Sequence, residues 1–117
     1  MLDTNIILGM LKSTPEILAI VGGTGLMAHQ CAFSAVTRME LLGYPGITAE
    51  EDALIRQRLA QLTYLAISSA VEDKAIALRR SRRVKLPDAL IAATALCHGL
   101  EILTLDAGLE SVMHSAT

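Results

Sequence analysis

The 117-residue chain has no tryptophan, one phenylalanine and two tyrosines, so aromatic residues make up only 3% of it. Hydrophobic residues still reach 52%, which leaves Leu, Ile, Val, Ala and Met to build a core. With this apolar content and 19% charged residues, the chain is expected to be globular and not disordered. We expect a single domain over residues 1–117, because this length supports one core but not two.

Membrane and export signals are also lacking. No apolar run approaches the roughly 18–20 residues that a helix needs to span a bilayer. The start, MLDTNIILGMLK, has neither the basic residues nor the cleavage site of a signal peptide. Only Cys31 and Cys97 are present, both in apolar surroundings, so no disulfide framework is expected. These absences predict a cytoplasmic protein that does not contact membranes.

The net charge of −2 gives no general sign of nucleic-acid binding, but the basic residues are unevenly placed. Half of the ten basic residues fall within seven positions: Arg79, Arg80, Arg82, Arg83 and Lys85. Two interpretations stay open. The cluster is either a solvated helix end, favourably placed against the helix dipole, or a patch that binds phosphate groups.

Apolar periodicity and turn residues divide the chain into alternating helices and strands. Helices are predicted over residues 4–12, 14–23, 35–43, 48–62, 69–83 and from Pro87 onwards. Strands are predicted over residues 1–3, 30–34, 63–68 and 101–105. This order predicts an α/β domain with a mostly parallel sheet, in which ligands bind at the carboxyl ends of the strands.

Capping residues set the predicted ends of several helices. Pro15 marks the first turn of one helix, and the Gly22–Gly23 pair marks its end. Thr48 is expected to cap the helix that follows it. Ser69 is expected to cap a later helix, with Glu72 completing a capping box.

Most of the twelve acidic residues have polar neighbours and are interpreted as surface residues. Four lie among apolar or small residues: Asp3, Glu40, Asp88 and Asp106. Each alone has a structural explanation. Asp3 and Asp106 would be helix N-caps, and Asp88 would stabilise the first turn of its helix. Glu40 would form a capping box with Thr37.

Together the four carboxylates point to a metal site. Asp3 and Asp106 each follow a predicted strand, and Asp88 heads an apolar helix that is expected to be buried. Ionised carboxylates are almost never buried without a partner. A divalent cation is the simplest partner for several of them, and oxygen ligands favour Mg²⁺ or Mn²⁺. The three histidines lack the spacing of a zinc site.

The segments that carry these residues are LDTNIIL, SAVTRMELLGYPG, KLPDALIAATALCHGL and ILTLDAGL. Their order and content resemble the four motifs of the PIN-domain ribonucleases, in particular the VapC-type toxins of toxin–antitoxin modules. The resemblance covers almost the whole chain. It implies a three-layer α/β/α sandwich with a short, mostly parallel sheet and an acidic pocket at the strand ends.

The resemblance also implies site residues and partners. The family's metal-binding and catalytic carboxylates fall on Asp3, Glu40, Asp88 and Asp106. Asn5 and Thr104 would order the pocket. The implied activity is Mg²⁺- or Mn²⁺-dependent endoribonuclease cleavage of RNA that leaves a 5′-phosphate and a 3′-hydroxyl. Arg38 and the cluster from Arg79 to Lys85 would bind the RNA backbone. A homodimer silenced by a small antitoxin protein is expected.

Two features depart from the family pattern. Only Met1 and Leu2 precede Asp3, so a short first strand is expected, and no Asp-Phe pair follows Asp106. The alternative function is therefore a catalytically silent PIN-like module that binds a protein or RNA partner. A metal-dependent phosphatase is the third candidate, but LDTN lacks a second Asp two residues after the first.

Overall fold

The computed structural model describes residues 1–116, so Thr117, the last residue of the predicted domain, lies outside the described part. Helices dominate the chain. The elements in order are α1 (Thr4–Leu11), α2 (Pro15–Thr24), the 3₁₀ helix η1 (Ala28–Gln30), β1 (Ala32–Ser34), α3 (Ala35–Leu42), α4 (Ala49–Leu59), β2 (Thr63–Leu65), α5 (Ser69–Ser81), α6 (Leu86–Cys97) and α7 (Ala107–Ala116).

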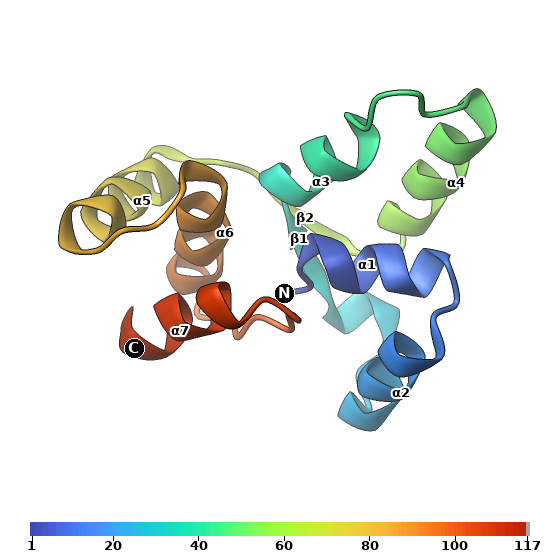
Figure 1. Cartoon of the computed structure of the whole chain (residues 1–117), viewed down its shortest axis with the longest axis horizontal. Helices are drawn as coiled ribbons and strands as arrows, with labels where there is room; N and C mark the ends of the chain where they lie inside the picture. Colours follow the sequence, from blue (N-terminus) through green and yellow to red (C-terminus); the bar gives the residue numbers. More distant parts are fainter. Residues whose placement is uncertain (117) are drawn as a thin grey trace.

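A short parallel sheet lies at the centre of the molecule (Figure 1). Strands β1 and β2 pair in parallel, with Ala32 opposite Thr63. On the other side of β1, the amide of Leu2 donates to the carbonyl of Ala32 over 2.8 Å. Leu2 also forms a parallel bridge with Leu103. The spatial order is therefore Leu103, Leu2, β1, β2, and parallel pairing is confirmed.

The outer strands are shorter than expected. Residues 1–3 and 101–105 were predicted as strands, but each contributes only a bridge, at Leu2 and at Leu103. The amide of Leu103 donates to the carbonyl of Met1 over 2.9 Å, and the amide of Asp3 donates to the carbonyl of Leu103 over 3.0 Å. Since α1 begins at Thr4, residues beyond Leu103 have no neighbouring strand with which to continue the ladder.

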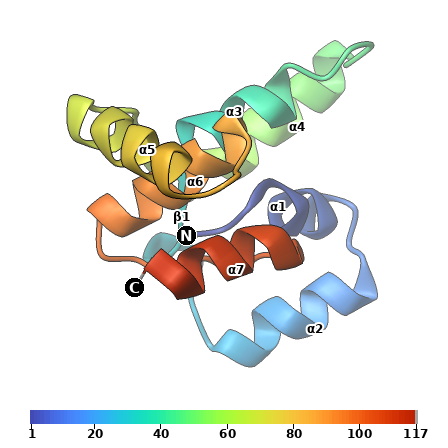
Figure 2. The same cartoon turned by 60° about the vertical axis from the view of Figure 1, so that its left-hand side comes forward.

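Helices cover the two sides of this sheet, as Figures 1 and 2 show. In the described part of the chain, one core cluster joins α1, α2 and α4 to the sheet, with Ile6 and Ile7 fully buried. A second cluster packs α5, α6 and α7 together around Val71 and Leu109. This arrangement confirms the predicted α/β/α sandwich, built almost without aromatic residues.

Helix ends follow the capping rules, with two corrections. Thr48 caps α4 as expected: its hydroxyl accepts from the amide of Glu51 over 3.1 Å, and Glu51 bonds back to the amide of Thr48. For α5 the cap is Ser68 and not Ser69, because the Ser68 hydroxyl accepts from the amide of Val71. The predicted capping box with Glu72 is therefore wrong.

The predicted stop of α2 is also wrong. The helix continues through Gly22 and Gly23 to Thr24, and it ends at Gly25, whose φ is +68°. Glycine weakens a helix without necessarily ending it. A left-handed residue directly after the last turn is what ends this one.

Within residues 1–116, no single helix is long and apolar enough to cross a membrane. Only α1 and α2 taken together meet the length and composition, and they are bent by 113° at their junction. Both cysteines are free thiols; Cys31 is buried, whereas Cys97 is exposed, although apolar surroundings were expected for both.

The junction of α1 and α2 is tightly packed. A Cβ atom built on Gly9 would lie 2.4 Å from Cγ1 of Ile17, which is far inside normal contact. Ile17 therefore rests directly on the backbone of α1 and joins the core there. By contrast, a Cβ atom on Gly22 would meet open space.

We expect Gly9→Ala to lower the free energy of unfolding by about 1–3 kcal/mol, because the added methyl group has to displace Ile17. Gly22→Ala is the matched control and should be neutral or more stable by up to about 1 kcal/mol. Urea unfolding followed by circular dichroism measures both. Equal stabilities of the two variants would contradict the close packing of α1 on α2.

Candidate functional site

Asp3 lies where the first sheet segment turns into α1, and it is only 6% exposed. One carboxylate oxygen, Oδ1, accepts from the amide of Thr4 over 2.8 Å, so Asp3 is the N-cap of α1 as expected. The other oxygen, Oδ2, accepts from the hydroxyl of Thr104 over 2.6 Å. The two partners of this carboxylate therefore come from opposite ends of the chain.

Thr104 connects Asp3 to the start of α7. Its hydroxyl oxygen accepts from the amide of Asp106 over 2.9 Å while its proton goes to Asp3. The Asp106 Oδ1 atom then accepts from the amides of Gly108 and Leu109 over 2.8 and 3.1 Å. Asp106 thus caps α7, as its structural explanation predicted, and its place beside Asp3 is set by Thr104.

Asp88 lies in the first turn of α6 and is half-buried. Burial raises the pKa of its carboxyl above the ordinary value, and the negative charges of Asp106 and then Asp3 raise it further. The positive charge of Lys85 acts in the opposite direction. The mutual repulsion means that three carboxylates from distant parts of the sequence lie within electrostatic range of one another.

The head of α6 is more exposed than the sequence suggested. A buried helix end was expected, but the buried stretch of α6 begins at Ala89 and continues through residues 91–95. Leu86, in the first turn, is 49% exposed. The apolar body of α6 packs against α5 and α7, while Asp88 in its first turn is only partly buried and is open to solvent on one side.

Glu40 joins the site through a hydroxyl group. Its Oε1 atom accepts from the Thr4 hydroxyl over 2.8 Å, and the Thr4 oxygen lies 3.0 Å from the hydroxyl of Thr37. The expected capping box of Glu40 with Thr37 is wrong, because Ser34 caps α3 by accepting from the amide of Thr37. Glu40 is in the body of the helix and exposed.

The sequence interpretation did not name Thr4 or Ser34, and it named Thr37 only as a capping partner of Glu40. Ser34 and Thr37 are fully buried, and their hydroxyl oxygens lie 3.3 Å apart. The available signal was a pair of hydroxyl residues within an otherwise apolar stretch at the end of a predicted strand. Their hydrogen bonds place α3 against the start of α1.

Asn5 has a buried acceptor without a partner. Within residues 1–116, its Oδ1 atom is the one buried side-chain oxygen or nitrogen that makes no hydrogen bond. Leaving such an atom unpaired costs about 1–3 kcal/mol. It sits two residues after Asp3, and it is free to accept a hydrogen bond from a water molecule or to ligate a cation.

The donor chemistry fits a hard divalent cation. The gathered donors are all oxygens, and a cation would relieve the repulsion that Asp3 and Asp106 impose on Asp88. The carboxylates do not form a preformed metal site. Among the described residues, no group of three His, Cys, Asp or Glu side chains is close enough to hold a metal. Asp88 and Glu40 would have to move towards Asp3 for the three carboxylates to share one cation.

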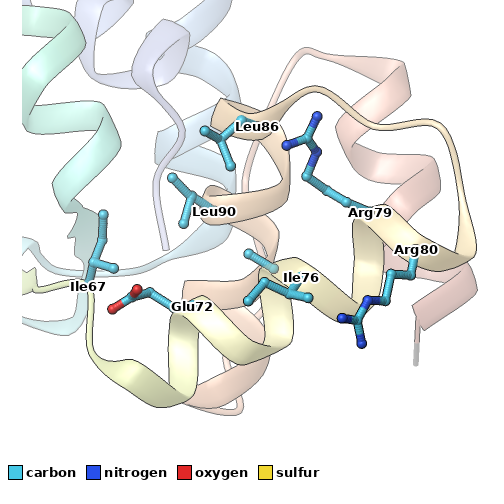
Figure 3. A pocket seen from close by; sticks show the side chains of 8 residues that line it. Ile67, Glu72, Ile76, Arg79, Arg80, Leu86 and Leu90 are labelled. Atoms are coloured by element: carbon cyan, nitrogen blue, oxygen red, sulfur yellow. The ribbon is translucent and has the colours of Figure 1, made fainter.

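The predicted RNA-binding cluster lines two hollows, and Arg79 contributes to both of them. Arg79 and Arg80 line a groove along α5 and α6 (Figure 3). Arg82 is held elsewhere, since its guanidinium donates to the Ser115 hydroxyl and to the carbonyl of Val112. These bonds fix the end of α5 to α7.

One basic residue of the cluster acts on the acidic group. Lys85 is the residue at the N-cap of α6, and its positive charge lowers the pKa of Asp88. Lys85 lines a hollow together with Arg79, Arg82 and Arg83. Arg38 is half-buried on α3, two residues before Glu40.

The chain is similar to known proteins over almost its whole length. Its sequence matches the family model of the PIN domain over residues 1–114. It is similar to a toxin–antitoxin complex from Klebsiella pneumoniae, with 30% identity and a TM-score of 0.77 over 90% of this chain and 84% of that chain. It also resembles the FitAcB structure from Neisseria gonorrhoeae, with 23% identity and a TM-score of 0.71 over 97% and 91% of the two chains, a likeness of fold alone. No curated protein matches the sequence.

The raised pKa of Asp88 predicts how stability depends on pH. The folded protein holds the Asp88 proton more tightly than the unfolded chain does, so the free energy of unfolding should fall as pH rises above 3.8 towards the raised pKa. Asp88→Asn lacks this titration. In buffer with EDTA it should show a shallower fall and be at least as stable as the parent at pH 7, as measured by urea unfolding across a pH series.

Glu16→Gln is the matched control, because Glu16 follows Pro15 in the first turn of α2 as Asp88 follows Pro87 in α6. This control should lose about 0.3–1 kcal/mol, since a carboxylate near a helix N-terminus is stabilising. A similar loss in Asp88→Asn would show that Asp88 acts only as a charge at a helix end.

Proposed function

This chain belongs to the PIN-domain family, and from that premise we propose that it is a metal-dependent endoribonuclease and the VapC-type toxin of a toxin–antitoxin pair. One observation carries the proposal. Asp3, Asp88 and Asp106 come from three distant segments and lie within electrostatic range at the end of the sheet. Helix capping explains the positions of two of them, Asp3 and Asp106. The stability of the fold, however, gains nothing from three negative charges near one another.

The residues have distinct roles in this proposal. Asp3 and Asp88 would hold Mg²⁺ or Mn²⁺, with Glu40 and Asp106 completing the donor set. When bound, such a cation lowers the pKa of a coordinated water and neutralises a phosphate oxygen. Thr104 would fix Asp3 by its short hydrogen bond to Oδ2.

Positive charge near the site supports an RNA substrate. An acidic pocket repels a phosphate backbone, so basic residues at its rim are needed for binding. Lys85 supplies positive charge that acts on Asp88, and we propose that Arg83 and Arg38 add to it. With aromatics at 3% of the chain, stacking on bases contributes little, and we propose that cleavage sites are selected by RNA shape and accessibility.

An antitoxin partner is part of the proposal, because the similar Klebsiella pneumoniae structure is a toxin–antitoxin complex. Next to the site, a groove of about 260 Å³ extends from Thr4 and Glu40 to Leu8 and Tyr44. Leu8 is 39% exposed on α1 and offers an apolar contact. An antitoxin segment lying there would cover Glu40. A single domain over residues 1–117, a homodimer and a cytoplasmic location complete the proposal.

A silent PIN-like module remains the second candidate. The observation in its favour is that the carboxylates of residues 1–116 do not already form a metal cage. It would use the same fold to bind a protein or an RNA without cleaving it.

Cleavage of structured RNA tests the proposal directly. With Mg²⁺ or Mn²⁺ the parent protein should cleave RNA, and EDTA should abolish cleavage. Asp3→Asn and Asp88→Asn should each reduce the rate at least about 100-fold, because each removes a ligand of the cation. The control is Glu16→Gln, which lies on α2 and should keep full activity. Activity that survives EDTA, or that is unchanged in both Asn variants, would rule out the mechanism, and no cleavage with either metal would favour the silent module.

Variants at Thr104 test a residue that would position Asp3 without binding the metal itself. Thr104→Val removes the hydroxyl that bonds to Asp3 and to the amide of Asp106, so the rate should fall about 10–100-fold. Thr104→Ser keeps the hydroxyl and should retain most of the activity. A metal titration of each variant gives the second readout: the Val variant should need a higher concentration of Mn²⁺ for half-maximal cleavage. Equal behaviour of the Val and Ser variants would exclude this role.

A further inference from the structure

Three hydroxyl groups form a chain of hydrogen bonds that ends on the carboxylate of Glu40. They belong to Ser34 at the end of β1, Thr37 in the first turn of α3 and Thr4 at the start of α1. The hydroxyl oxygens of Ser34 and Thr37 lie 3.3 Å apart, and those of Thr37 and Thr4 lie 3.0 Å apart. The Thr4 oxygen lies 2.8 Å from Oε1 of Glu40. The chain therefore runs from a buried strand end to the candidate site.

The protons of this chain can point in only one direction. An ionised carboxylate accepts hydrogen bonds and donates none, so the Thr4 proton goes to Glu40. A hydroxyl group has a single proton, so Thr4 has to accept from Thr37. Thr37 in turn accepts from Ser34, whose own oxygen accepts from the amide of Thr37. Each of the three hydroxyls thus donates towards Glu40.

Helix capping explains only part of this chain. Ser34 caps α3, which accounts for its hydroxyl. Thr37 is fully buried, and a valine there would have nearly the same shape without a polar group to bury. Within residues 1–116, the hydrogen bonds of the Thr37 hydroxyl lead to Ser34 and Thr4 alone. Its contribution is therefore to the chain that ends on Glu40.

Thr4 holds two of the predicted ligand residues at once. Its backbone amide donates to Oδ1 of Asp3 over 2.8 Å, and its hydroxyl donates to Oε1 of Glu40 over 2.8 Å. Asp3 is the N-cap of α1, whereas Glu40 lies on α3, and these two helices are in contact (Figure 1). One residue therefore links carboxylates that are 37 positions apart in the sequence.

We propose that this hydroxyl chain positions Glu40 for the cation, with Thr4 as the positioning residue that contacts it. The inference rests on the metal site of the proposed function and gives a role in it to residues that bind no metal. The Thr4 bond occupies Oε1 and leaves Oε2 of the same carboxylate as a second acceptor. Glu40 has to move towards Asp3 to share a cation, and it starts from a bond to the residue next to Asp3.

The physical benefit is preorganisation. Glu40 is exposed, and a long surface side chain loses rotational freedom when it binds an ion. A hydrogen bond that restricts the side chain beforehand reduces this loss and so raises the affinity. Ser34 and Thr37 are shielded from water, and hydrogen bonds in a chain polarise one another, so the bond that Thr4 donates is strengthened by the two behind it.

Binding of Mn²⁺ alone to the full chain tests this role without RNA, and isothermal titration calorimetry gives the dissociation constant. Thr4→Val keeps the shape of the side chain and removes the hydroxyl, so the dissociation constant should rise about 10–100-fold. Thr4→Ser keeps the hydroxyl and should bind nearly as tightly as the parent. Thr37→Val should weaken binding less than Thr4→Val does, because the bond from Thr4 to Glu40 remains but loses its donor.

A double-mutant cycle distinguishes positioning from a structural effect. Glu40→Ala removes the side chain that Thr4 holds, so adding Thr4→Val to it should cause no further loss of Mn²⁺ binding. An equal loss with and without Glu40 would mean that Thr4 acts on another part of the molecule, and the proposal would be wrong. If Glu40→Ala binds too weakly to measure, the difference between Thr4→Val and Thr4→Ser decides.

Thr94→Val is the matched control, because Thr94 is a fully buried threonine whose hydroxyl donates to the carbonyl of Leu90 within α6. It should leave Mn²⁺ binding unchanged. Circular dichroism checks that every variant is folded, and Thr37→Val decides if Thr4→Val does not fold. A parent that binds no Mn²⁺, a Thr4→Val variant that binds like the parent, or a Thr4→Ser variant as weak as Thr4→Val would overturn the proposal.

The result is separable from the proposed function. RNA cleavage that requires Mn²⁺ and stays unchanged in Thr4→Val at every Mn²⁺ concentration would overturn the positioning role and leave the nuclease intact. Mn²⁺ binding that weakens as expected, in a protein that cleaves no RNA, would support the positioning role and not the nuclease.

Discussion

The pairing of Leu2 with Leu103 is the contact on which the site depends. Two backbone hydrogen bonds, from Leu103 to Met1 and from Asp3 to Leu103, tie the first residues of the chain to a segment about a hundred residues later. They place Asp3 beside Thr104, whose hydroxyl fixes both Asp3 and the start of α7. A ladder this short is stable because helices pack on both of its sides, and Leu2 itself is buried in the core.

The site combines stabilising and destabilising interactions. Asp3 and Asp106 each cap a helix, which stabilises the fold, but their charges act against Asp88. Asn5 adds a buried oxygen without a partner. Features of this kind are typical of functional sites, where local stability is exchanged for a binding surface that a ligand completes. The positive charge of Lys85 opposes this effect on the pKa of Asp88, which is also open to solvent on one side.

Much of the fold could be predicted from the sequence, because local signals determine it. The helix periods, the Thr48 capping box and the parallel order of the strands all follow from residues close in sequence. The errors in predicted helix ends arise where two nearby residues are both suitable as the cap or the stop. Ser68 and Ser69 are equally good caps by type, and the backbone conformation selects Ser68. Gly22 and Gly23 resemble a helix stop, but the left-handed turn falls at Gly25.

The candidate residues come from the sequence, but their contacts come from the structure. Carboxylates in apolar segments indicated the four candidates, and their assignment to one site stays a prediction. The hydrogen bonds of Thr4 with Glu40 and of Thr104 with Asp3 depend on tertiary placement, which no local pattern encodes. The same holds for the partial exposure of Asp88, because its burial depends on how α6 packs against elements distant in sequence.

The bond between Asp3 and Thr104 has a consequence for biosynthesis. The ribosome makes Thr104 101 residues after its partner Asp3. A nascent chain that ends before Thr104 therefore lacks the hydroxyl that orders the Asp3 carboxylate, as well as Asp106. The arrangement that brings these two carboxylates together can form only after the whole stretch from Asp3 to Asp106 has been translated.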